Sequence, residues 1–430
     1  MASVADREAL YRFLANPKVT LAGVLTGHLE QTRARLRQRG VVRIVHDTTT
    51  FRSVGEREGL GVLRGGAKGF LAHVAQAVAA EETREPLGVV GVHPFLHQDA
   101  VAHQGMTPGQ RVTATRARPR AAKESARWEH LALTVSAALP DGVEALHVMD
   151  QEADGYDLLA TVQQAHLRYV IRACPTRQTT EATLAVNAVP ARQPGTVFRT
   201  VPLAPRSPQK VVKSRGRHPA RADRLATLEV RWGTVTLPRR QYNETPLRTL
   251  TLQAVRVVEP APPAGEVPTE WMLFTSEPVW TLEDATAVVD HYRARWLIEE
   301  YFKALKTGCA FEKRQLTSLP ALLRALAIFI PGAWRLLVLR HVGRATLPQP
   351  VGDLLDRTQL LVLRKLLASR NYHLPRRGPP CRRRCSASPR SAVTSRTTAH
   401  PAGSFSVAAS PDSSTPRSDG TSRETRCDQS

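Results

Sequence analysis

The chain has 430 residues, of which 42% are hydrophobic, and it is long enough for two domains or for one large domain with an insertion. No uninterrupted apolar run reaches the roughly eighteen residues that cross a bilayer, and the N-terminus lacks the basic-then-apolar pattern of an export signal. We therefore expect a cytoplasmic protein with no membrane segment. Five cysteines without CxxC spacing disfavour a zinc site.

The net charge of +22 points to a polyanionic partner, because each neutralised phosphate releases counterions. The last 55 residues, from Arg376, hold ten Arg against four Asp/Glu, so +16 remains on the rest of the chain. A GC-rich genome that favours Arg codons would be an alternative source of this excess.

Hydrophobic periodicity predicts helices over Ala5–Arg37 with a break at Asn16–Pro17. Strands and helices then alternate, which predicts an α/β sheet, and two of the strands end in an Asp. The expected strands are Val41–Asp47, Gly69–Ala80, Pro86–Phe95, Ala145–Asp150 and Arg168–Cys174, and the expected helices are Ser125–Leu139 and Tyr156–His166.

Residues 176–269 read as a β-rich insertion with strands at Ala226–Trp232 and Thr249–Val258 and a cationic loop, Arg206–Arg224. Glu270–Pro278 returns to a buried strand. One long helix is predicted over Thr281–Thr307, with Thr281 and Asp284 as a capping box and Gly308 at its C-terminus. Further helices are expected from Pro320 to about Ser369. From Arg376 the chain is too poor in large apolar residues to fold.

The long helix carries a polar face with one carboxylate, one phenol and three cations. Tyr292, Arg295, Glu299, Lys303 and Lys306 fall within an arc of roughly 80° at 100° per residue. A solvated face with a Glu299–Lys303 pair would give the same pattern, so the spacing alone does not decide the function.

The same residues form the YREK signature: Tyr292, Arg295, Glu299 and Lys306. The chain resembles, along roughly residues 7–368, the IS-four family of DDE insertion-sequence transposases. HDTTTF is similar to the family's first catalytic segment, and VMDQEADGYDLL to its second, with Gln151 where the family usually has Arg. EWMLFTSEPVWTLEDATAVVDHYRARWLIEEYFKALKTG is similar to the family throughout.

The resemblance implies an RNase H-like α/β core with the β-rich insertion, in which Asp47, Asp150 and Glu299 hold two Mg²⁺ ions, with Mn²⁺ as an alternative. Such a site would stabilise both the attacking and the leaving oxygen of a phosphodiester. The family cuts transposon ends through a hairpin intermediate and joins them to target DNA. It acts as a homodimer in a synaptic complex. For this chain, the resemblance implies a bacterial protein that is associated with the nucleoid through DNA.

The resemblance also implies DNA contacts by Tyr292, Arg295, Lys303 and Lys306, and stacking of a flipped base on Trp271. A buried strand aromatic is the alternative for Trp271. The cationic loop, with Arg215 and Arg217, is expected to bind DNA, although a merely solvated loop remains open.

The expected domain plan places a remnant of an N-terminal helical DNA-binding region at 1–37 and the catalytic core at 38–345. C-terminal helices at 346–375 and a disordered, out-of-frame basic tail at 376–430 follow. The shortened N-terminus and the tail leave two alternatives: an enzyme of reduced activity, or an inactive DNA-binding relative that inhibits transposition. A third is another RNase H-like nuclease, against which the YREK spacing and the insertion argue.

Overall fold

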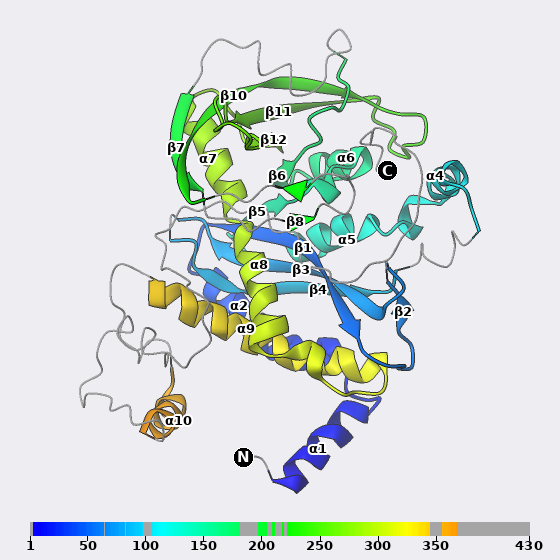
Figure 1. Cartoon of the computed structure of the whole chain (residues 1–430), viewed down its shortest axis with the longest axis vertical. Helices are drawn as coiled ribbons and strands as arrows, with labels where there is room; N and C mark the ends of the chain where they lie inside the picture. The colour runs from blue at the N-terminus through cyan, green and yellow to red at the C-terminus, as the bar shows by residue number, and fades with distance from the viewer. Residues whose placement is uncertain are drawn as a thin grey trace. The chain divides into compact units, whose positions relative to one another are not determined.

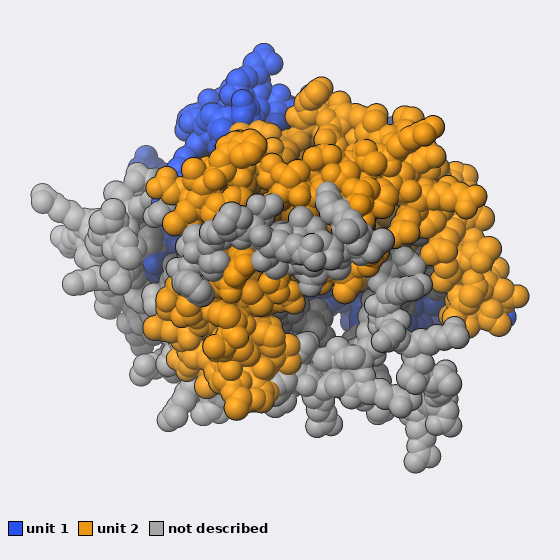
Figure 2. All heavy atoms as spheres, turned by 90° about the horizontal axis from the view of Figure 1, so that it is seen from above, with its two compact units in different colours: residues 1–105, 134–144, 294–395 blue, residues 106–133, 145–293, 396–430 orange. Residues whose placement is uncertain are grey.

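The computed structural model describes residues 3–63, 65–81, 83–97, 105–180, 197–203, 209–210, 217–218, 222–344 and 355–368. The chain is a mixed α/β protein that divides into two compact units, coloured separately in Figure 2. Unit 1 comprises residues 1–105, 134–144 and 294–395, and unit 2 comprises 106–133, 145–293 and 396–430. We describe each unit by itself.

Unit 1 is built on a strongly twisted antiparallel ladder (Figure 1). Its strands are β1 (Val41–Ser53), β2 (Gly61–Val62), β3 (Lys68–Ala79) and β4 (Pro86–Phe95). β3 lies in the middle, with β1 on one side and both β2 and β4 on the other. The last eight of the twelve residues of β3 are all buried, as expected for a central strand that is covered on both faces.

The helices of unit 1 cover this ladder. They are α1 (Val4–Ala15), α2 (Leu21–Leu36), α8 (Trp296–Lys303), the π-helical turn η5 (Ala304–Gly308), the 3₁₀ turn η6 (Phe311–Lys313), α9 (Leu319–Arg344) and α10 (Arg357–Ala368). α2 and α9 pack on each other and on β4, and α8 packs on β1 and α9. α9 is long and apolar enough to cross a membrane by length and composition, a property that core helices share, and Ala325, Ile330 and Leu337 on it are buried.

Unit 2 carries its own run of strands in the order β5-β6-β12-β11-β10-β7. β5 and β6 are parallel, and every later pair is antiparallel, so this part of the sheet is mixed. The strands are β5 (Glu144–Met149), β6 (Arg168–Arg172), β7 (Val197–Leu203), β10 (Arg224–Pro238), β11 (Thr249–Val258) and β12 (Glu270–Thr275), with a separate two-stranded ribbon of β8 (Gln209–Lys210) and β9 (Arg217–His218).

The helices of unit 2 are α4 (Pro108–Ala117), the 3₁₀ turns η1 (Arg120–Ala122) and η2 (Gln151–Ala153), α5 (Ala126–Ala137), α6 (Tyr156–Gln164) and α7 (Leu282–Arg293). Trp128 of α5 and Leu159 of α6 meet Ile171 of β6 and Phe274 of β12 in one hydrophobic core. The crossover helix α6 joins the parallel strands β5 and β6, as a parallel pair requires.

Most of the predicted elements are confirmed within one to three residues, including the two N-terminal helices and their break. Three predictions are wrong. β1 continues to Ser53 because Thr48, Thr49 and Thr50 are β-branched and pair with β3, so Asp47 lies within the strand and not at its end. The strand predicted at Ala226–Trp232 is also longer, because β10 runs to Pro238 in register with β11.

The third difference is that the long helix is divided. α7 ends at Arg293, a turn covers Ala294 and Arg295, α8 ends at Lys303, and a π-helical turn follows. The predicted capping box at its start is confirmed, since Thr281 and Asp284 exchange hydrogen bonds of 2.8 and 3.2 Å. The left-handed residue at its end is Ala310, with φ of 50°, and not Gly308.

Candidate active site

Asp47 lies in β1 opposite Val74 of β3, and its side chain is 13% exposed. Its Oδ1 accepts a hydrogen bond of 2.7 Å from the backbone N–H of Thr48. Its Oδ2 accepts one of 2.8 Å from Nη1 of Arg295. A carboxylate in the middle of a covered strand needs such partners, because an unpaired buried charge is costly.

Glu299 lies on α8, one turn beyond Arg295. Its Oε1 lies 3.4 Å from Nη2 of Arg295, so the two arms of a single guanidinium reach both carboxylates. α8 packs on β1, and this packing brings the two segments together. Two of the three acidic residues expected in the site therefore meet within unit 1, on either side of one cation.

Burial raises the pKa of Asp47 to about 7, against an ordinary value of 3.8. The positive charge of Arg295 acts in the opposite direction, while the negative charge of Glu299 adds to the increase. Burial therefore disfavours the charged form of Asp47 even with Arg295 in place. A site of this kind favours a further cation.

Lys306 lies on the π-helical turn that follows α8. Its ammonium nitrogen is 5.6 Å from the centre of the Phe51 ring, and Glu312, Glu299 and Asp47 are close enough to act on its charge. Burial is the largest effect and lowers its pKa. The π-helical turn sets the direction of Lys306, which a regular continuation of α8 would have placed differently.

Tyr292 does not share a helical face with Arg295 and Glu299, because the turn at Ala294 and Arg295 interrupts the helix between them. Tyr292 lies on α7 in unit 2, is 6% exposed, and packs edge-on against Trp271 with ring centres 5.5 Å apart. Trp271 lies on β12 and is also 6% exposed. Lys303 is exposed on α8. The expectation of a single polar face is corrected, since it assumed an unbroken helix.

Asp150 lies in unit 2, directly after β5. Its Oδ1 accepts a hydrogen bond of 2.9 Å from the backbone N–H of Glu152 and so caps the turn η2. This position at the carboxyl end of a parallel strand is the one that the sequence predicted. Asp154, four residues on, is buried and binds the backbone N–H of Cys174 and the side chain of Arg177.

Arg127 is a neighbour of Asp150 that the sequence analysis did not identify. It lies at the start of α5, its side chain is 10% exposed, and its Nη2 lies 2.6 Å from Oε2 of Glu152. Asp150 is among the acidic groups whose charge acts on it. No local signal marks Arg127, because only the packing of α5 in unit 2 brings it to Glu152 and within the electrostatic influence of Asp150.

Of the cationic loop, Arg215 lies outside the described residues, and Arg217 is described only as part of the short strand β9. The tail from Arg376 also lies outside them. Within the described part of the chain, no three His, Cys, Asp or Glu side chains gather closely enough to hold a metal ion. Asp47 and Glu299 form a pair in unit 1, and Asp150 belongs to unit 2.

A comparison with protein families matches residues 103–330, more than half of the chain, to the family described as Transposase DDE domain. The chain belongs to this family. The matched residues include Asp150, Trp271, Arg295 and Glu299, whereas Asp47 precedes them. The matched region thus includes two of the three acidic residues expected in the site from the sequence.

Among solved structures, this DDE family member is similar to a chain of the piggyBac transposase synaptic complex with hairpin DNA. The TM-score is 0.35 and the sequence identity 10%, and the match covers 92% of this chain and 67% of the other. A likeness of this degree does not establish a common mechanism.

Proposed function

We propose that the protein is a DNA transposase of the IS-four type that cleaves transposon ends and transfers them into target DNA. The observation that carries this proposal is the meeting of Asp47 and Glu299 around Arg295 in a member of the DDE family. Carboxylates on β1 and α8, two elements far apart in the sequence, have been brought together and partly buried around one guanidinium. Carboxylates whose pKa is shifted by burial, as that of Asp47 is, are common at catalytic sites.

The residues of this pair fit a divalent metal ion. Both are carboxylates, which are the ligands that Mg²⁺ prefers, and one guanidinium already reaches both of them. We propose Asp47, Glu299 and Asp150 as the ligands of two Mg²⁺ ions, with Mn²⁺ as a substitute. When bound, these ions would stabilise negative charge on the attacking and leaving oxygens of the scissile phosphodiester.

The cations of the site would position the DNA. Arg295 and Lys306 both lie beside the Asp47–Glu299 pair, so a phosphate held by them would be presented to the carboxylates. Lys303 is exposed one turn along α8 and would bind the backbone nearby. Base stacking by Trp271 stays a prediction, and it requires Tyr292 to move away from the indole.

An RNase H-like core is part of the same proposal. Unit 1 contains three antiparallel strands in the order β4-β3-β1, and unit 2 contains the parallel pair β5–β6 with its crossover helix α6. The described strands between β6 and β12 would be the β-rich insertion. Hairpin formation, cut-and-paste transfer and a homodimeric synaptic complex are further parts of the same proposal.

The test is nicking of a duplex that carries the inverted repeats read from the DNA flanking the gene, in Mg²⁺, by the full chain. Glu299→Gln, Asp47→Asn and Asp150→Asn should each lower the rate by at least a thousandfold and leave DNA binding nearly unchanged. Glu300→Gln is the matched control, because Glu300 is the next residue on α8 and pairs with Arg344 at 2.9 Å and Arg340 at 3.6 Å. Glu299→Gln nicking at the rate of Glu300→Gln would exclude the proposed site.

A further inference from the structure

Residues 106–123 in unit 2 form a strongly basic segment. They include four Arg and one Lys, namely Arg111, Arg116, Arg118, Arg120 and Lys123, and no Asp or Glu. The segment folds into α4 and the turn η1, and a capping box between Thr107 and Gln110 fixes the start of α4.

α4 is unusual in that none of its ten residues is buried. Helices in globular proteins owe most of their stability to an apolar face packed on the core. Packing inside unit 2 therefore does not account for α4. The guanidinium of Arg116 on α4 lies 4.8 Å from the centre of the Tyr242 ring.

Tyr242 belongs to the turn between β10 and β11, which is basic as well. Residues 239–248 include Arg239, Arg240 and Arg248, all exposed, against a single acidic residue, Glu244. The turn has a defined shape: the N–H of Arg240 donates to Oδ1 of Asn243 at 2.9 Å, and Nη1 of Arg239 donates to the carbonyl of Thr245 at the same distance.

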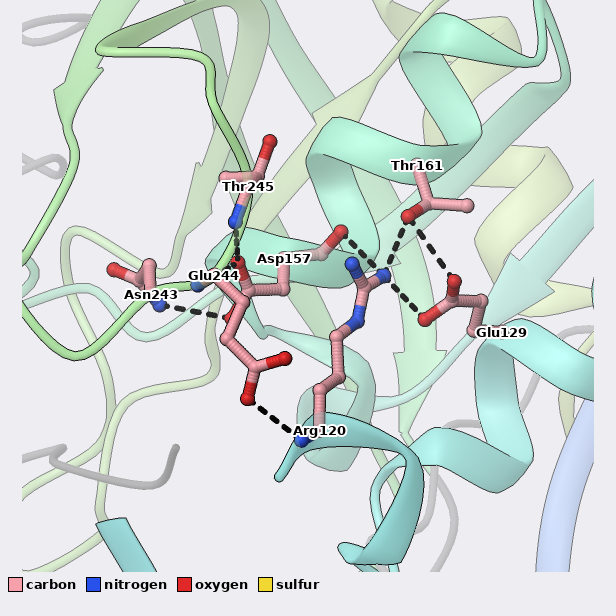
Figure 3. Close-up of polar contacts among 7 residues, drawn as sticks. All are labelled: Arg120, Glu129, Asp157, Thr161, Asn243, Glu244 and Thr245. Carbon is pink, nitrogen blue, oxygen red and sulfur yellow. Dashed lines mark hydrogen bonds and ion pairs between the residues drawn. The ribbon is translucent and has the colours of Figure 1, made fainter. Parts of the chain in front are cut away.

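A polar network around Arg120 ties these two basic segments to the core of unit 2 (Figure 3). The guanidinium of Arg120 reaches inward to Glu129 and Thr161 and donates to the carbonyl of Asp157 at 2.8 Å. Its backbone N–H donates to Oε1 of Glu244 at 2.6 Å. η1 is thereby fastened to α5, to α6 and to the β10–β11 turn at once.

Asp157 completes the network from α6. Its Oδ1 accepts hydrogen bonds from the backbone N–H groups of Glu244 and Thr245 at 3.1 and 3.0 Å, and its Oδ2 accepts one from Asn243 at 3.2 Å (Figure 3). The acidic groups of this region, Glu129, Asp157 and Glu244, are thus engaged with Arg120 or with the turn. On α4 and the turn, the exposed charged side chains are all arginines except Glu244.

We propose that α4 and the β10–β11 turn form a surface that binds the phosphate backbone of DNA, with the Arg120 network holding its two halves in register. The choice of DNA as its partner rests on the proposed function, and the surface shares no residue with the cationic loop 206–224. Exposed arginines on two fixed segments suit a regularly spaced row of phosphates, and they bind it without reading the base sequence.

The test is duplex binding by the full chain over a series of salt concentrations, comparing wild type with Arg111→Gln/Arg240→Gln. For two lost phosphate contacts, the slope of log affinity against log salt should fall by roughly 1.8, and the affinity near 0.1 M salt by tenfold or more, on duplexes of any sequence. The matched control is Arg357→Gln/Arg364→Gln, which removes the same charge from exposed positions on α10. It should keep the wild-type affinity within about threefold.

Equal losses in the two double variants would show a general charge effect and overturn the surface. Wild-type binding by Arg111→Gln/Arg240→Gln, with normal Mg²⁺-dependent nicking, would overturn the surface and leave the proposed function standing. Failure of the wild-type chain to bind DNA would overturn both.

Asp157→Ala tests whether the Arg120 network holds α4 and the β10–β11 turn in fixed positions. This change makes the protein more positive by one charge, so charge alone predicts tighter DNA binding. Loss of the three hydrogen bonds to the turn predicts weaker binding, because the arginines must then be ordered on binding. A chain that keeps its melting temperature and binds DNA more tightly would overturn the role of the network.

Discussion

Arg295 donates a hydrogen bond of 2.8 Å to Asp47, a residue 248 positions earlier in the chain. The same guanidinium reaches Glu299 one helical turn away at 3.4 Å. A cation therefore lies between the two carboxylates that we propose as metal ligands. This arrangement explains how unit 1 tolerates two neighbouring acidic side chains that are each less than one-third exposed.

Arg295→Gln should destabilise the metal-free protein by about 1–3 kcal/mol at neutral pH, because it leaves partly buried carboxylates without a charged partner. The measurement is urea unfolding in the presence of EDTA. Asp47→Asn should remove most of this cost, so the effects of the two substitutions should not add.

Arg344→Gln provides the comparison for Arg295→Gln. Arg344 also pairs with a carboxylate on α8, Glu300 at 2.9 Å, but its side chain is 55% exposed. An exposed pair contributes about 0–1 kcal/mol. Equal destabilisation by both changes would mean that Arg295 has no special relation to the site.

Trp271→Ala should destabilise the protein by about 3–5 kcal/mol, because the indole is 6% exposed on β12 and in contact with Tyr292. Trp271→Phe keeps an aromatic ring against Tyr292 and should cost much less. The measurements are unfolding free energies, with nicking and hairpin yields alongside. An Ala variant that keeps its stability and its nicking but forms few hairpins would instead assign base stacking to Trp271.

His28 should make the stability of the protein depend on pH. Burial lowers its pKa to about 4, helped by the charges of Arg35 and Arg335, and its Nε2 accepts a hydrogen bond of 3.1 Å from the N–H of Val89. The folded state thus favours neutral His28. Its contribution is complete above about pH 6.5, where the unfolded histidine is neutral too, and is lost as the pH falls towards 4.

The loss between pH 6.5 and pH 4 should reach up to about 3 kcal/mol. His28→Gln should abolish this part of the pH dependence in urea unfolding. His147, whose pKa burial also lowers to about 4, and Asp47, whose raised pKa acts in the opposite direction, contribute equally to both proteins and cancel in the difference. Parallel stability profiles for wild type and variant would contradict the prediction.

Gly88→Ala should disrupt the packing of α2 on β4. An added Cβ would lie 2.2 Å from Oγ1 of Thr32, which is fully buried on α2, and the φ of 150° at Gly88 is itself unfavourable for an L side chain. We expect a loss of at least about 2 kcal/mol. Gly27→Ala, on the same helix with no atom within 4 Å of the added Cβ, should stabilise by about 0.5–1 kcal/mol. The same sign for both changes in thermal unfolding would contradict this packing.

The sequence by itself determined the mixed α/β class and most helices and strands, whereas the acidic residues of the site were expected from the resemblance to a family. The helices and strands follow from local signals, such as the run of apolar residues in Gly69–Ala80 and the Thr281–Asp284 capping box. Each of these signals lies within one short stretch of the chain, so a single sequence is enough to read them.

Only the tertiary structure decided where the long helix breaks, that β1 runs past Asp47, and that Tyr292 is buried against Trp271. Pairing with β3 extends β1, and packing of α8 on β1 places Arg295 between Asp47 and Glu299. The contacts of Arg127 with Glu152 and of Arg120 with Glu129, Thr161 and Asp157 likewise join distant segments. Such contacts are set by how whole elements pack, and local periodicity carries no information about their partners.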